Sequence, residues 1–200
     1  MHFSVFLSWL AYALVGLLMS ATSCTPDYTP KPRGWNRIDL PRPTYRPLNG
    51  QHPYAFDVSR YARELRDSSR FAIHKPHWIN INYPRFKATI QLTYEDLHGR
   101  PAALQALIAD ARKLTSKHEI KASGIREQVL KTRTGLTADV FDLSGEVPSQ
   151  FQFYVTDSAR HFLRGALYFR TAVANDSLAP VIQYLRADAV QMLNTLRFKE

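Results

Sequence analysis

QFQFYVTDSARHFLRGALYF, residues 150–169, has the pattern of two strands joined by a short polar connection. In its first half, Phe151, Phe153 and Val155 alternate with more polar neighbours, which is the period of a half-buried strand. Asp157 and Ser158 favour a turn, because their short side chains bond nearby backbone groups. An apolar run follows. The stretch therefore predicts an aromatic hairpin at the centre of a sheet.

The remaining strand signals lie on both sides of this hairpin. Alternating apolar residues predict a strand over 54–58 and another over 86–94, the latter with one apolar and one wet face. Residues 77–82 read as a strand that stops before a proline. Residues 125–132 and 136–143 read as a pair of strands. The charged stretch 59–70 is expected to be helical or a loop.

Two helices complete the pattern. Pro101 opens the first, which is expected to run to about Ala122, and an apolar stripe at helical spacing faces a core: Leu104, Leu107, Ile108, Ala111 and Leu114. Residues 175–177 supply capping side chains for the second, with Pro180 in its first turn. Hairpin-linked strands with helices outside predict an α+β fold, a single mostly antiparallel sheet flanked by helices. This order resembles the Mog1/PsbP-type α/β/α sandwich.

The N-terminus has the pattern of a lipoprotein signal. Residues 3–26 carry no charged side chain, residues 5–19 are mostly apolar, and small residues precede Cys24, the one cysteine of the chain. We interpret residues 1–23 as a signal peptide and Cys24 as the lipidated residue. One alternative is an uncleaved membrane anchor, since about 20 apolar residues can span a bilayer. Another is a misassigned start codon that has trimmed a basic n-region. A lipid on Cys24 or a retained membrane segment would each place the body outside the cytoplasm.

Residues 24–50 form a Pro-rich arm ahead of a domain that we assign to residues 51–200. Six prolines lie between Thr25 and Gly50, and such density favours an extended, semi-rigid spacer. The arm also interleaves apolar and basic residues, with Trp35 and Arg37 among them. Part of it is therefore expected to pack on the domain or on a partner, unless these residues are incidental to a spacer.

Composition and motifs argue against several functional classes. The net charge of +9 favours acidic partners, but the 26 Lys and Arg are dispersed, whereas nucleic-acid binding calls for a clustered stripe. The chain has no zinc-protease, phosphate-loop or nucleophile-elbow motif, so no metal or cofactor is predicted. Asp157, Ser158 and His161 lie too close in sequence for a catalytic triad, which is assembled from separate elements.

What remains is a non-catalytic interaction protein. Arg160 and Arg164 flank the hairpin and could grip a carboxylate or phosphate, or could be solvated edge residues. Small domains without a reaction centre act by burying aromatic and arginine anchors against a partner.

Several motifs in order resemble the GldD family of lipoproteins, which is tied to gliding motility and type IX secretion in Bacteroidetes-type bacteria. They are TPKPRG at 29–34, WINI at 78–81, QFYVTDS at 152–158, HFLRGALYF at 161–169 and NDS at 175–177. The resemblance implies a palmitate-type lipid anchor on Cys24, a cell-envelope location with the body facing the periplasm, and other envelope proteins of the machinery as partners. It carries over no catalytic residue.

The resemblance also implies a pairing. Many members of that family carry one cysteine in the first strand and another before the central strand, where this chain has His52 and His77. If the family pair is a disulfide, these two histidines are expected to be neighbours, with Cα atoms within about 7 Å.

Two functions follow from different classes. The first is an assembly or structural component of the gliding and secretion apparatus. The alternative is a periplasmic module that binds a small molecule or lipid in a cleft between sheet and helix. An enzyme is third, and needs a cleft that gathers Asp157, His161 and another titrating group.

Overall fold

The computed structural model describes residues 38–170 and 175–199, with the backbone alone for residues 175–177. Residues 36–200 form one compact unit. Its elements in chain order are β1 (Tyr45–Pro47), β2 (Tyr54–Ala55), β3 (Asp57–Ser59), β4 (Arg63–Arg66), β5 (Ile79–Tyr83), a 3-10 turn (Pro84–Phe86), β6 (Ala88–Asp96), α2 (Pro101–Ser116), β7 (Ala122–Lys131), β8 (Thr137–Gly145), β9 (Ser149–Thr156), β10 (His161–Phe169), α3 (Asn175–Thr195) and β11 (Arg197–Phe198).

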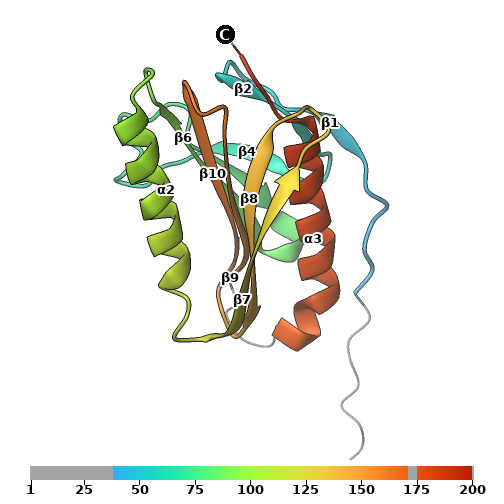
Figure 1. Ribbon diagram of the computed structural model, residues 1–200. Coiled ribbons are helices and arrows are strands. Elements are labelled where there is room, and N and C mark those ends of the chain that lie inside the picture. The colour runs from blue at the N-terminus through green and yellow to red at the C-terminus, as the bar shows by residue number, and fades with distance from the viewer. Residues whose placement is uncertain (1–37, 171–174, 200) are drawn as a thin grey trace, which may run out of the picture. The chain divides into compact units, whose positions relative to one another are not determined.

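One antiparallel sheet of seven strands organises the unit. Its order is β4-β5-β6-β10-β9-β8-β7, so the predicted hairpin β9–β10 lies near the middle. Helix α2 covers one face and α3 the other, as Figure 1 shows with the sheet seen between them. The α+β prediction is confirmed. The strand pairs β1–β3 and β11–β2 form two separate two-stranded sheets.

Each face of the sheet builds its own core. The larger core lies between the sheet and α3 and includes Phe153, Ile90 and Leu185. The smaller lies on the α2 side and includes Phe141, Tyr154 and Phe162. Among the described residues, both cores are built within this unit, and we expect it to fold without residues 1–35.

The prediction that residues 150–155 form a half-buried strand is wrong. Every residue from Ser149 to Val155 in β9 is buried, on both faces. The residue types still alternate along β9 because its two faces meet different helices. Helix α3 covers the face that carries Phe151 and Phe153, and α2 covers the face that carries Gln152 and Tyr154. Only the position of α2, which is distant from β9 in the chain, decides that this mixed face is dry.

Three element predictions need correction. Helix α2 ends at Ser116 rather than near Ala122, because Ala122 already belongs to the edge strand β7, where it pairs with Gly145 of β8. Part of the stretch taken as helix or loop forms β4, which pairs with β5. The strand expected over 54–58 splits at Phe56 into β2 and β3, because the two halves pair with different partners.

The end of the Pro-rich arm lies on the domain. Tyr45–Pro47 pairs with β3, and Ile38 and Leu48 pack against the larger core. Cys24, Trp35 and Arg37 lie outside the described residues. Within residues 38–170 and 175–199, no helix is both long and apolar enough to cross a bilayer.

Candidate functional site

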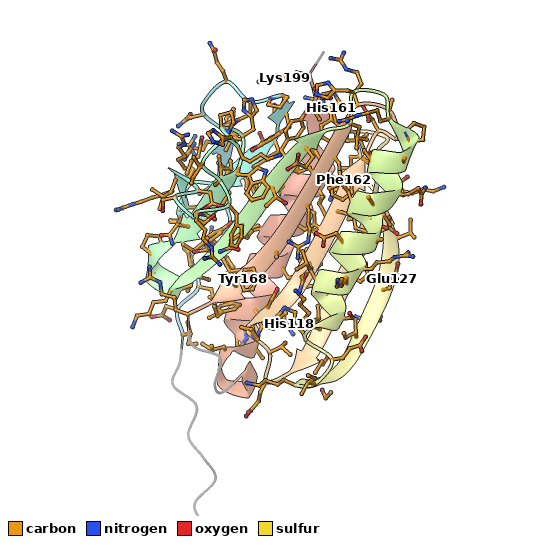
Figure 2. All side chains as sticks on the ribbon, turned by 90° about the vertical axis from the view of Figure 1, so that its left-hand side faces the viewer. His118, Glu127, His161, Phe162, Tyr168 and Lys199 are labelled. Atoms are coloured by element: carbon orange, nitrogen blue, oxygen red, sulfur yellow. The ribbon has the colours of Figure 1, made fainter. Side chains whose placement is uncertain are left out.

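A cleft opens between α2 and the part of the sheet that α2 leaves uncovered. Helix α2 packs over β9 and β10, and Figure 2 looks onto this face, where β4, β5 and β6 lie beside the helix rather than beneath it. The cleft has a volume of about 590 Å³. Its lining comes from α2, from β6 and β10, and from the loop between β4 and β5: Asp67, Ser69, Phe71, Trp78, Gln91, Thr93, Glu95, Leu107, Asp110, Leu114, Phe162 and Arg164.

Aromatic and aliphatic side chains form the apolar walls. Leu107 and Leu114 come from the inward stripe of α2, and Phe162 rises from β10 beside the helix (Figure 2). Trp78 is held in place because its indole N–H donates to the carbonyl of Tyr94 over 2.9 Å. Phe71 stands at the mouth with 67% of its surface exposed. Such rigid, exposed rings are typical anchors for a binding partner.

Arg164 supplies a guanidinium to the cleft. One of its N–H groups donates to Gln152 Oε1 over 2.9 Å, and the Thr115 hydroxyl donates to the same oxygen over 3.2 Å. Gln152 and Thr115 are both buried, so the guanidinium of Arg164 is fixed next to β9 and α2. Burial and the nearby Arg164 charge lower the pKa of His118, which keeps this imidazole neutral beside the cation.

Carboxylates balance this charge. Glu95 forms an ion pair with Lys75, whose Nζ lies 2.6 Å from Oε2 and 5.9 Å from the centre of the Trp78 ring. Asp67 and Asp110 contribute negative charge from the loop and from α2. The cleft thus offers apolar walls with a few polar groups of both signs. This arrangement can hold an amphipathic group by contact and hydrogen bonding.

The predicted anchor residues are not gathered in one place. Arg164 lines the cleft, whereas Arg160 is an exposed residue of the β9–β10 turn. Sequence reasoning missed Phe71 and Trp78 as cleft residues, and Gln152 as the residue that holds Arg164. Phe71 lies in a stretch of sequence without clear periodicity. Leu107 and Leu114 follow the helical spacing of an apolar stripe, and this spacing is the same whether the stripe faces a core or lines a cleft.

The Asp157 turn is structural, as predicted. Asp157 Oδ1 accepts hydrogen bonds from the backbone N–H groups of Ala159, Arg160 and His161 over 2.9–3.0 Å. Burial raises the pKa of Asp157, but these three N–H groups lower it more, so the net shift is downward.

His161 and Tyr94 form a buried contact apart from the cleft. The Tyr94 hydroxyl lies 2.7 Å from His161 Nδ1, and the imidazole stacks on Phe198 with ring centres 4.8 Å apart. Figure 2 shows His161 at the end of the sheet next to Lys199. Burial and neighbouring carboxylates, Asp96 foremost, raise the pKa of Tyr94 to about 12, so its phenol stays protonated at neutral pH and is a poor nucleophile.

His52 and His77 lie in direct contact. Their Nδ1 atoms are 3.3 Å apart, and the two rings meet edge to face. Glu64 lies 3.1 Å from the other nitrogen of His52. Burial, together with His52, lowers the pKa of His77. The contact joins the segment before β2 to the segment before β5. Within the described ranges, no group of three or more His, Cys, Asp or Glu side chains is arranged to hold a metal ion.

Comparisons with known proteins give a family and a fold. A family model described as "Gliding motility lipoprotein GldD" matches residues 25–198. No curated protein matches the chain. Among solved structures, the solution structure of the cyanobacterial PsbP protein (CyanoP) from Synechocystis sp. PCC 6803 is similar, with 6% sequence identity and a TM-score of 0.44. The match covers 81% of this chain and 96% of that chain.

Proposed function

Because the chain belongs to the family of gliding motility lipoproteins GldD, we propose that it is a non-catalytic assembly component of the gliding motility and type IX secretion machinery. The observation that carries this proposal is the cleft beside α2, whose mouth presents Phe71 and whose walls include Trp78 and Arg164. Aromatic rings and arginine dominate the binding energy of protein interfaces. We therefore assign the cleft to another envelope protein of the machinery.

The proposed layout is a signal peptide over residues 1–23, a tether over 24–50 and the domain over 51–200. Cys24 carries the lipid, and the domain faces the periplasm at the end of the tether. A lipid anchor would restrict the domain to partners near one membrane, which suits an assembly role. Palmitate labelling in cells tests the anchor: the chain should incorporate label, and Cys24→Ala should not. Label that persists in Cys24→Ala would contradict it.

Site-specific photocrosslinking tests the partner surface. A photoreactive residue at position 71 is compared with one at Val129, which is 65% exposed on the far edge strand β7 against 67% for Phe71. In native membranes, position 71 should crosslink to envelope proteins of the gliding machinery, identified by mass spectrometry, and position 129 should not. Identical adducts from both positions, or none from position 71, would overturn the assignment.

A small-molecule or lipid ligand is the second candidate. The cleft volume of about 590 Å³ falls within the roughly 300–1,000 Å³ of typical ligand pockets. Native mass spectrometry of the purified protein distinguishes the two functions. A co-purifying ligand that is lost in Leu107→Trp, which fills the cleft, would favour this candidate. An empty cleft combined with position-71 crosslinks would favour assembly.

A further inference from the structure

Exposed apolar side chains concentrate on one edge of the sheet. Seven large hydrophobic residues are exposed in the described part of the chain, and four of them lie within 13 consecutive residues. These four are Tyr61 at 43%, Leu65 at 49%, Phe71 at 67% and Ile73 at 65% exposure. They lie on β4, the edge strand, and on the segments that flank it. We call residues 60–75 the β4 rim.

The β4 rim is also basic. Its four arginines and Lys75, less Glu64 and Asp67, give a net charge of +3 in 16 residues, a third of the +9 carried by all 200 residues. The arginines are Arg60, Arg63, Arg66 and Arg70, and all four are exposed. Each apolar side chain of the rim lies within three residues of one of them.

These arginines are not neutralised by carboxylates. Within the described residues none of the four is in an ion pair, whereas Arg112, Arg126 and Arg186 each pair with Glu127 or Asp142. Arg60 donates to the carbonyl of Tyr45, and the Arg70 guanidinium lies 4.9 Å from the centre of the Phe71 ring. The two acids of the rim are engaged elsewhere, Glu64 with His52 and Asp67 with the backbone of Ser69.

From this combination we infer that the β4 rim docks onto the surface of an anionic lipid bilayer. Unpaired arginines bind anionic headgroups, while the exposed tips of Tyr61, Leu65 and Ile73 enter the headgroup boundary. We choose the bilayer because four exposed arginines within 11 residues lack a carboxylate partner in the described part of the chain, and a layer of anionic headgroups can neutralise all of them together. The rim would thus set which edge of the domain faces the membrane. This goes beyond the proposed function, and it does not require the Cys24 lipid.

Vesicle binding by residues 36–200 tests the rim without the tether. This unit has its own cores and lacks Cys24. It should bind vesicles of phosphatidylglycerol and phosphatidylcholine, bind pure phosphatidylcholine weakly, and release with added salt. The double variant Arg66→Ala/Arg70→Ala should lower binding by about tenfold or more, since each cation near an anionic surface contributes roughly a factor of five. Ile73→Ser should weaken binding as well.

Edge strand β7 provides matched controls. Val129→Ser removes an apolar side chain as exposed as Ile73, and Arg126→Ala/Lys131→Ala removes two exposed cations. These variants should bind vesicles like the wild type. Equal losses from β7 and rim variants would mean attraction by net charge alone and would overturn the proposal, as would no binding to anionic vesicles.

The rim variants leave the cleft residues untouched, so the two proposals can fail separately. If Ile73→Ser and Arg66→Ala/Arg70→Ala abolish the position-71 protein crosslinks but leave vesicle binding unchanged, the rim is a protein-binding surface and the bilayer proposal is overturned. If vesicle binding falls while the crosslinks persist, both proposals stand.

Discussion

Gly165 is required by space rather than by backbone conformation. It lies opposite Phe153 in β9 and Leu92 in β6, and a Cβ atom at this position would clash with the Phe153 ring. The Phe153 ring therefore occupies the space that a side chain at position 165 would fill. The packing of the aromatic hairpin depends on this pairing of a phenylalanine with a glycine.

We expect Gly165→Ala to lower the free energy of unfolding by about 1–3 kcal/mol, the usual cost of overpacking a core. Urea unfolding measures the loss. Gly124→Ala is the control, because a Cβ there meets no atom within 4 Å. Adding Phe153→Leu to Gly165→Ala should recover part of the loss. A Gly165→Ala protein as stable as the wild type would contradict this account.

Asp188 is a buried carboxyl among hydroxyl groups. Only 1% of its surface is exposed, and the Tyr45 hydroxyl donates to Oδ1 over 2.9 Å. Its second oxygen is buried as well, close to the hydroxyls of Ser59 and Tyr83. Burial raises the pKa of Asp188 despite the hydrogen bond, so the fold favours the protonated acid.

Asp188→Asn should therefore stabilise the protein at neutral pH. A carboxyl with a raised pKa supports the fold fully below its unfolded pKa of about 3.9 and loses that contribution as pH rises. The variant should match the wild type near pH 3 and exceed its free energy of unfolding by on the order of 1 kcal/mol at pH 7. Chemical unfolding across this range measures the difference. A difference that shrinks as pH rises would contradict the assignment.

At the scale of elements, an ion pair between Arg186 and Asp142 connects α3 to the sheet. Arg186 on α3 meets Asp142 on β8 in a two-pronged contact, with distances of 2.5 and 2.9 Å. The same guanidinium lies over the Phe151 ring, 5.2 Å from its centre. The Asp142 side chain is 15% exposed and that of Arg186 is 37% exposed, so solvent screens the pair only in part.

We expect Arg186→Ala to destabilise the protein by about 1–2 kcal/mol. Arg186→Lys should recover little, because an ammonium group cannot form the planar double contact. Thermal unfolding with Arg112→Ala as a control checks this, since Arg112 and Glu127 form a more exposed pair. Equal losses of stability in Arg186→Ala and Arg112→Ala would contradict the prediction that the α3 ion pair stabilises the fold more than an exposed pair does.

At the scale of the whole unit, His52 and His77 join the chain ahead of β2 to the sheet. Their imidazole contact means that side chains at these positions meet in space. We expect the double variant His52→Cys/His77→Cys, made in residues 36–200, to form an intrachain disulfide on oxidation. Because the crosslink restricts the unfolded chain, it should add about 2–4 kcal/mol. Mass spectrometry and melting with and without reductant measure it. Free thiols after oxidation would contradict the predicted pairing.

Local patterns were enough to find the sheet and both helices. The period-two alternation in β6, the turn chemistry of Asp157 and the apolar stripe of α2 each act over a few residues, so they can be read directly. Boundaries were less certain. The end of α2 and the strand β4 depend on pairing with β8 and β5, which no local pattern records.

The amino-acid sequence by itself determined the α+β class, the central aromatic hairpin and the family motifs, because these follow from short-range periodicity and residue identity. Only the tertiary structure decided that both faces of β9 are dry, that α2 leaves a cleft beside β6, and that unpaired arginines and apolar side chains share the β4 rim. These features arise where segments distant in the chain pack together or leave a face uncovered, and packing geometry is not a local property of the sequence.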